Sequence, residues 1–154
     1  MRGNSQPAQT ILYHVHDPMC SWCWGYRRSW DGLREALENA VTVVNVVGGL
    51  APDNDEPMPQ EQRDTIAGYW RQVAERTDAE FNYDFWKHCT PRRSTYPACR
   101  AVLTAKRQLA EQAMIDAIQQ AYYLRAMNPS DNSTLIALAS ELGLDVTQFS
   151  EDLL

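Results

Sequence analysis

Long apolar stretches are missing from this sequence. No run approaches the roughly 20 apolar residues that a membrane-spanning helix needs. The start of the chain, MRGNSQPAQTILYHVHD, also lacks the continuous apolar core and the small-residue cleavage site of a secretory signal peptide. We therefore predict a cytoplasmic protein without a membrane partner.

Basic residues are scattered and in the minority. The chain has 14 Lys and Arg residues against 20 Asp and Glu residues, which gives a net charge of −6 at pH 7. A nucleic-acid-binding domain needs a positively charged stripe or patch that neutralises phosphates. This composition predicts that nucleic acid is not a partner.

Internal repeats and low-complexity tracts are absent as well. The 154 residues suit one domain, and 44% of them are hydrophobic. Five tryptophans and seven tyrosines argue against an intrinsically disordered chain. The sequence is therefore able to build a packed core.

The chain has four cysteines, and two of them form a CxxC motif. Cys20 and Cys23 lie in the stretch HDPMCSWCWG. Thiols in the cytosol stay reduced unless they take part in a catalytic cycle. In this setting the motif favours a redox or metal-binding role over a structural disulfide.

The N-terminal part of the chain has the pattern of a strand, a helix and a second strand. Residues 10–16 alternate imperfectly between apolar and polar side chains, as in a strand. The segment AVTVVNVVGGL is rich in β-branched residues and predicts a second, largely buried strand. Together they predict an α/β fold with a βαβ unit of parallel strands at residues 8–50. The predicted helix between the strands carries one buried stripe: Cys23, Tyr26, Trp30, Leu33 and Leu37.

A helical block is predicted for residues 58–154. The Pro- and Asp-rich segment APDNDEPMPQ separates it from the βαβ unit. Asp145 and Gln148 are spaced as a capping box for its last helix, and Gly143 suits the end of the preceding one. The apolar stripes of the earlier helices lie within residues 66–73, 98–109, 114–122 and 135–142.

The position of the CxxC motif gives the two cysteines different predicted roles. Cys20 falls at the first turn of a helix that begins near Ser21, where the free N–H groups and the helix dipole stabilise an anion. A thiolate there is more acidic than an ordinary cysteine and serves as the nucleophile. Cys23, one turn further in, is predicted to be the buried thiol that resolves a mixed disulfide.

Other interpretations of the same residues stay open. A zinc site needs two more ligands; His88, Cys89 and Cys99 are available, but no second CxxC or HxxxH follows. His14 and His16 either tune the thiolate or pack against the helices. Trp22 either offers an apolar surface to an unfolded peptide or packs against the helical block.

Three stretches carry a resemblance to a known family. DPMCSWCWG, PRRSTYPACRAV and DNSTLIALASELGLD together resemble the DsbA-type thioredoxin-fold oxidoreductases of the branch without a signal peptide. The resemblance implies a thioredoxin-like core with a helical insertion and thiol–disulfide exchange at Cys20 and Cys23, surrounded by Pro18, Ser21, Trp22 and His16. It implies protein or small-molecule disulfides as substrates, no bound cofactor, and glutathione as a redox partner.

The resemblance also implies a part of the fold that this sequence does not show. Family members continue after the helical insertion with two strands and a final helix, and the first of those strands begins with a cis-proline. This sequence stops at FSEDLL, so we expect the C-terminal ββα part to be absent. Two parallel strands alone leave exposed edges, which predicts self-association into a homo-oligomer.

Two competing functions remain. The related glutathione-dependent isomerases (the 2-hydroxychromene-2-carboxylate type) and kappa-class transferases share the fold, but typically carry serine where Cys20 stands. A chain without the C-terminal part of the fold is also compatible with a non-catalytic binding module. The presence of cysteine at both positions favours the oxidoreductase.

Overall fold

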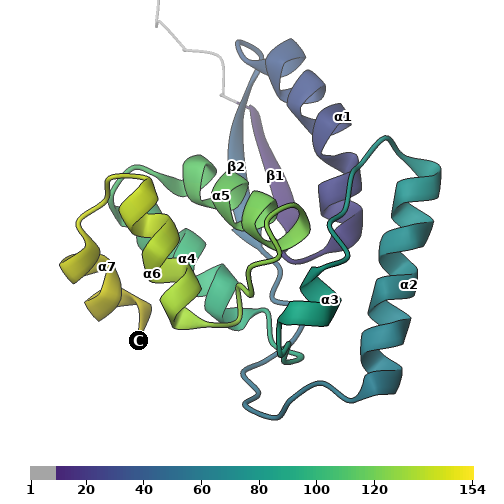
Figure 1. Cartoon of the computed structure of the whole chain (residues 1–154). Helices are drawn as coiled ribbons and strands as arrows, with labels where there is room; N and C mark the ends of the chain where they lie inside the picture. The colour runs from purple at the N-terminus through teal and green to yellow at the C-terminus, as the bar shows by residue number, and fades with distance from the viewer. Residues whose placement is uncertain (1–9) are drawn as a thin grey trace, which may run out of the picture.

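A computed structural model describes residues 10–154 of the chain (Figure 1). Residues 8 and 9 of the predicted βαβ unit, and most of the stretch MRGNSQPAQTILYHVHD, lie outside the described residues. The elements are β1 (Thr10–His16), α1 (Ser21–Leu37), β2 (Val41–Val47), α2 (Gln60–Arg76), α3 (Phe85–His88), α4 (Tyr96–Arg107), α5 (Glu111–Tyr123), α6 (Asn132–Glu141) and α7 (Val146–Leu153).

The predicted βαβ unit is present, and its two strands are parallel as expected. They pair in register from Thr10 with Val41 to His16 with Val47. One face of β1 is open: Ile11, Tyr13 and Val15 are exposed by 49%, 62% and 66%. The prediction of a largely buried second strand was wrong, since no residue of the described strand β2 is fully buried. Only one face of this two-stranded sheet is covered by helices within the part of the chain that the structure describes.

Helix α1 begins at Ser21 as predicted, but its predicted stripe is only partly buried. Trp30 is the one buried residue of the helix, while Tyr26 and Leu33 are exposed by 50% and 39%. A narrow sheet cannot cover the whole stripe. The helix instead meets α2 at Gly25, where a Cβ atom would lie 2.5 Å from Val73 Cγ1. Only glycine permits this approach without a shift.

The helical block holds the main core of the molecule. Gly143 follows α6 with a φ of +71°, so the predicted helix end is confirmed. The Asp145 side chain accepts a hydrogen bond from the Gln148 N–H at 3.0 Å, but the Asp145 N–H donates to Gln108 Oε1 at 2.8 Å, so Asp145 caps α7 without the reciprocal half of the predicted capping box. Helix α7 packs on α4 and α6, on the side of the block away from α1 (Figure 1). The buried core comprises Ala98, Ala101, Val102, Ala105, Met114, Ile115, Ile118, Ala121, Leu135, Leu138, Ala139, Phe149 and Leu153.

An aromatic cluster joins the start of α1 to the helical block. Its centre is Trp70 on α2, which contacts Tyr122 and Tyr123 at the end of α5 with ring centroids 5.1 and 5.2 Å apart. Phe85 on the short helix α3 completes the buried set. The sequence did not predict α3, because a single turn carries no apolar period. Trp24 of α1 stacks on Tyr123 at 5.4 Å and so attaches the CxxC helix to the cluster.

Candidate active site

The two cysteines of the CxxC motif lie where β1 passes into α1. A tight turn after β1 ends in a hydrogen bond from the Cys20 N–H to the Asp17 carbonyl at 3.0 Å. Cys20 is the N-cap of α1, and its carbonyl accepts the first helical hydrogen bond, from the Trp24 N–H at 3.1 Å. Cys23 lies one turn further along. Both are free thiols and both are half-buried.

The environment shifts the pKa values of the two thiols in opposite directions. The Cys23 thiol donates a hydrogen bond to Cys20, and this contact is the main reason why the pKa of Cys20 falls to about 6. Backbone N–H groups of Cys23 and Trp22 lower the Cys20 pKa further, while burial opposes them. The same hydrogen bond, followed by burial, raises the pKa of Cys23. The arrangement holds a thiolate at Cys20 and a protonated thiol at Cys23 near neutral pH.

A buried carboxylate lies directly behind the motif. Asp17 is 2% exposed, and its Oδ1 accepts a hydrogen bond from the Met19 N–H at 2.8 Å. Its Oδ2 accepts hydrogen bonds from the Leu50 N–H at 2.9 Å, from the Thr95 hydroxyl at 2.7 Å and from the Cys99 thiol at 3.5 Å. Hydrogen bonds to an ionised carboxylate at 2.7 to 2.9 Å, such as those from Met19, Leu50 and Thr95, are among the stronger ones in proteins. Asp17 therefore links the turn before Cys20 to the segment after β2 and to the start of α4.

The two histidines of β1 point into the protein. His14 stacks on Trp30 at a centroid distance of 3.8 Å and makes a 3.1 Å hydrogen bond through Nδ1 to Asn45 Oδ1. His16 is 4% exposed and stacks on His14 at 5.0 Å. Burial, helped by His14, lowers the pKa of His16 to about 4, so the imidazole is neutral near pH 7. His16 and Cys23 line the same small cavity, which α5 closes.

The remaining residues predicted around the motif have different exposures. Pro18 is buried in the turn and Ser21 is half-buried at the start of α1. Trp22 is 43% exposed, and the Arg76 guanidinium lies over its ring at 5.8 Å. Both interpretations of Trp22 agree with its position, because part of the side chain is exposed and Arg76 of α2 lies over the ring. The roles of these residues stay predictions.

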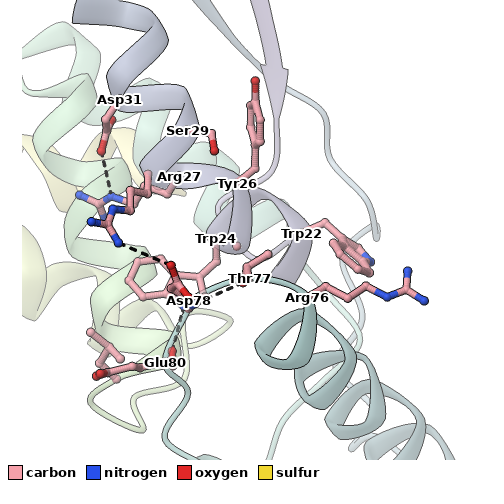
Figure 2. Close-up of a pocket in the computed structure, with 14 residues that line it drawn as sticks. Trp22, Trp24, Tyr26, Arg27, Ser29, Asp31, Arg76, Thr77, Asp78 and Glu80 are labelled. Atoms are coloured by element: carbon pink, nitrogen blue, oxygen red, sulfur yellow. Dashed lines mark hydrogen bonds and ion pairs between the residues drawn. The ribbon is translucent and has the colours of Figure 1, made fainter.

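A cavity of about 700 Å³ opens beside Trp22, between α1 and the segment that follows α2 (Figure 2). Trp24 and Glu80 form part of the cavity wall, and the Trp24 indole N–H donates a hydrogen bond to the Glu80 carbonyl at 3.0 Å. Arg28 and Asp78 both line the cavity and form an ion pair at 3.6 Å, and both side chains are about nine-tenths exposed. The surface next to the CxxC motif is thus aromatic with paired charges.

The other two cysteines are placed less favourably for exchange. Burial raises the pKa of Cys89, whose thiol donates to the Ala126 carbonyl at 3.1 Å. Burial, followed by the charge of Asp17, raises the pKa of Cys99 to about 12. Within residues 10–154, no three His, Cys, Asp or Glu side chains are grouped so as to hold a metal ion.

Sequence reasoning missed the contacts that surround the motif. Asp17 and Thr95 stand inside the stretches DPMCSWCWG and PRRSTYPACRAV, yet neither was singled out. Their hydrogen bond joins residues 78 positions apart, which no local pattern encodes. The available signal was that both residues lie in stretches that carry the family resemblance.

No helix between residues 10 and 154 has the length and hydropathy that a bilayer-spanning segment needs.

The family model and the solved structures point to thioredoxin-fold proteins. A family model described as thioredoxin matches residues 13–154. A solved structure from Nitrosomonas europaea, whose description suggests a protein disulfide isomerase, is 28% identical with a TM-score of 0.80, and the match covers 94% of this chain and 70% of that one. The cytosolic disulfide reductase DsbM from Pseudomonas aeruginosa is 24% identical with a TM-score of 0.77, over 93% of this chain and 68% of that one. DsbM has also been solved with glutathione.

Curated relatives have a different description. The ClpXP adapter protein SpxH of Halalkalibacterium halodurans is 23% identical over 148 residues, which are 92% of this chain and 48% of the relative. The SpxH protein of Bacillus subtilis is 21% identical over 145 residues, with the same coverage. The chain thus spans about half the length of the curated relatives that it matches.

Proposed function

This chain belongs to the thioredoxin family, and on that basis we propose that it is a thiol–disulfide oxidoreductase that works through Cys20 and Cys23. The predicted thioredoxin-like α/β fold and the resemblance to DsbA-type proteins are confirmed by the family match and by the fold of the solved neighbours. The roles of individual residues, the substrate and the partners below are parts of the proposal.

The proposed exchange has two steps. The Cys20 thiolate attacks one sulfur of a substrate disulfide, so that a Cys20–substrate disulfide forms and the other substrate sulfur leaves as a thiolate that takes up a proton. Cys23 then loses its proton and attacks Cys20 Sγ. This step forms the Cys20–Cys23 disulfide and releases the second substrate thiol. In sum, the pair gives up two electrons and the single proton of Cys23, and the two substrate sulfurs gain two electrons and two protons, of which the second proton comes from solvent.

The hydrogen bond between the two thiols is the observation that carries the proposal. It lowers the pKa of Cys20 to about 6, so most of the Cys20 population is thiolate at pH 7. Only the thiolate is nucleophilic. The partner that donates this hydrogen bond is also the thiol that must attack next, and it stays protonated until the mixed disulfide forms. This contact supports the proposed order of the two steps.

Glutathione is the proposed thiol partner that restores the dithiol, and protein or small-molecule disulfides are the proposed substrates. Two glutathione thiols supply the two electrons and become glutathione disulfide. The solved complex of DsbM with glutathione supports this choice, and the cytosolic description of DsbM supports a cytoplasmic location for the chain. No cofactor need be bound.

The direct test is an equilibrium in glutathione buffers of different thiol-to-disulfide ratios. Reduced thiols are trapped by alkylation and located by mass spectrometry. The proposal expects Cys20 and Cys23 to interconvert as a pair, with Cys89 unchanged. A Cys23→Ser chain should accumulate the mixed disulfide with glutathione at Cys20. Failure of the wild-type pair to form a disulfide at any ratio would contradict the proposal.

A protein-binding adapter is the second candidate, favoured by the curated relatives that are described as ClpXP adapters. Exposed aromatic side chains of α1, Trp22 and Tyr26, give it a surface. The two functions separate in one experiment: a Cys20→Ser, Cys23→Ser double variant loses exchange but retains partner binding if the chain is an adapter.

The glutathione-dependent isomerase or transferase is distinguished by its use of glutathione as a bound cosubstrate. Saturable glutathione binding that survives Cys23→Ser, measured by calorimetry, is the result that this alternative requires. The oxidoreductase instead requires that Cys23→Ser stops release of glutathione from Cys20.

A further inference from the structure

Asp17 is a buried carboxylate next to the reactive pair, and the exchange steps above do not use it. Its side chain is 2% exposed. None of the ion pairs found within residues 10–154 involves it. Burying a charge without a cationic partner is costly unless several hydrogen bonds compensate. The position of this carboxylate therefore needs an explanation beyond packing.

The donors to Asp17 come from three separate segments of the chain. Met19 belongs to the turn that leads into Cys20, Leu50 follows β2, and Thr95 caps the start of α4. Thr95 extends the link, because its hydroxyl oxygen accepts a hydrogen bond from the Ala51 N–H at 3.1 Å. The Thr95 N–H in turn donates to the Ala51 carbonyl at 2.9 Å. The three segments are thus locked to one carboxylate.

The same residue also holds the nucleophile. The Asp17 carbonyl accepts the Cys20 N–H, so any shift of Asp17 moves the first turn of α1. We propose that Asp17 is a positioning residue of the dithiol: its carboxylate fixes the turn that carries Cys20, and its negative charge opposes the Cys20 thiolate. This inference rests on the proposed function, since the charge affects exchange only if the Cys20–Cys23 pair reacts.

The charge acts in a definite direction. The Asp17 carboxylate raises the pKa of Cys20 and of Cys23, although other contacts outweigh it at Cys20. Removing the charge therefore stabilises the thiolate and, with it, the reduced pair. A pair whose reduced form is stabilised is a stronger oxidant. The ionisable groups that surround the carboxylate are His16 on β1, Cys20 and Cys23 at the start of α1, Cys99 on α4, and Tyr122 and Tyr123 on α5.

The test measures two quantities in the full chain with Asp17→Asn. One is the pH midpoint of Cys20 alkylation, and the other is the glutathione thiol-to-disulfide ratio at half-reduction. We expect the midpoint to fall by about half a pH unit or more and the ratio to fall about threefold or more, because one pKa unit is tenfold in the equilibrium. Asp152→Asn removes an equal charge from α7, where Asp152 pairs with Arg107, and should leave both quantities unchanged.

Thr95→Val gives a result of the opposite sign and keeps the test decisive if Asp17→Asn fails to fold. It retains the charge but removes the shortest hydrogen bond to Oδ2, so the carboxylate is less neutralised and the Cys20 midpoint should rise. Equal midpoints in the wild type and in a folded Asp17→Asn chain would overturn the proposal, as would a fall of the midpoint with Thr95→Val. The midpoint needs no exchange activity, so its outcome is separate from a failure of the proposed function.

Discussion

The helical block and the βαβ unit bury their side chains to very different degrees. Helices α4 to α7 enclose a continuous core in which most members, such as Ile118 and Leu138, are fully shielded from solvent. Within residues 10–47, Trp30 is the only large apolar side chain that is buried. Cys20 and Cys23 belong to the less packed half, at the place where it meets the block.

The difference suggests a division of labour in which the helical block is the rigid support and the βαβ unit carries the candidate site. A half-buried position leaves Cys20 accessible from solvent, whereas a core position would shield it. The well-packed half supplies fixed contacts to the site, namely Thr95 at the start of α4 and Tyr123 at the end of α5. Reactive segments on a rigid support are a common arrangement for catalytic sites.

The largest expected effect is the loss of disulfide exchange when Cys20, which lies in the less packed half, is substituted. Cys20→Ser should lower the rate of disulfide exchange by about a thousandfold or more, because no other thiolate is available near neutral pH. Cys89→Ser is the matched control and should retain the rate, since burial raises the pKa of Cys89. An active Cys20→Ser chain, measured with glutathione disulfide, would place the reaction elsewhere.

A matched pair of leucine truncations tests the packing contrast itself. Leu138→Ala in the core of the block should cost about 2–5 kcal/mol of unfolding free energy, the usual range for a buried leucine. Leu33→Ala on α1 should cost about 1 kcal/mol or less, because Leu33 is 39% exposed. Urea unfolding of both variants measures the two costs. Equal costs would mean that the two halves are packed alike.

Acid should weaken the βαβ unit through His16. The pKa of His16 is about 4 in the folded chain against 6.5 for an unperturbed histidine, so the unfolded state binds more protons between these values. The contribution of neutral His16 to the free energy of unfolding is fully present above pH 6.5. It is lost as the pH drops towards 4, which lowers the free energy of unfolding by up to about 3 kcal/mol.

His16→Gln should flatten this part of the pH profile, followed by urea unfolding at several pH values. The exposed His88 gives the control, and His88→Gln should keep the wild-type slope. If His16→Gln and the wild type lose stability in parallel below pH 6.5, the buried neutral imidazole is not the cause.

How much the sequence predicts also differs between the halves. Period and cap signals located the helices of the block, because each local pattern agrees with what packing requires there. The same reasoning overestimated burial in the βαβ unit: Tyr26 and Leu33 follow a helical stripe but have no sheet wide enough to cover them. The CxxC motif was visible, whereas the contacts of Asp17 depend on the tertiary fold.

The smallest expected effect concerns the open face of β1. The predicted self-association stays a prediction, and Tyr13 and Val15 give it a surface. Val15→Lys should reduce the sedimentation coefficient or the concentration-dependent aggregation of the chain, since a charge opposes pairing of exposed strands. Leu109→Lys is the control, because Leu109 is an isolated exposed side chain, 98% accessible. A monodisperse wild-type monomer would remove the prediction.

The most direct test of the central claim is the pH dependence of Cys20 alkylation in the reduced wild-type chain, followed residue by residue by mass spectrometry. The contact with Cys23 and the helix start predicts a midpoint near pH 6 for Cys20, while Cys23 stays unmodified over the same range. A Cys20 midpoint near that of an ordinary cysteine, roughly pH 8.5, would contradict the account. The less packed half would then hold a CxxC motif without an activated thiol.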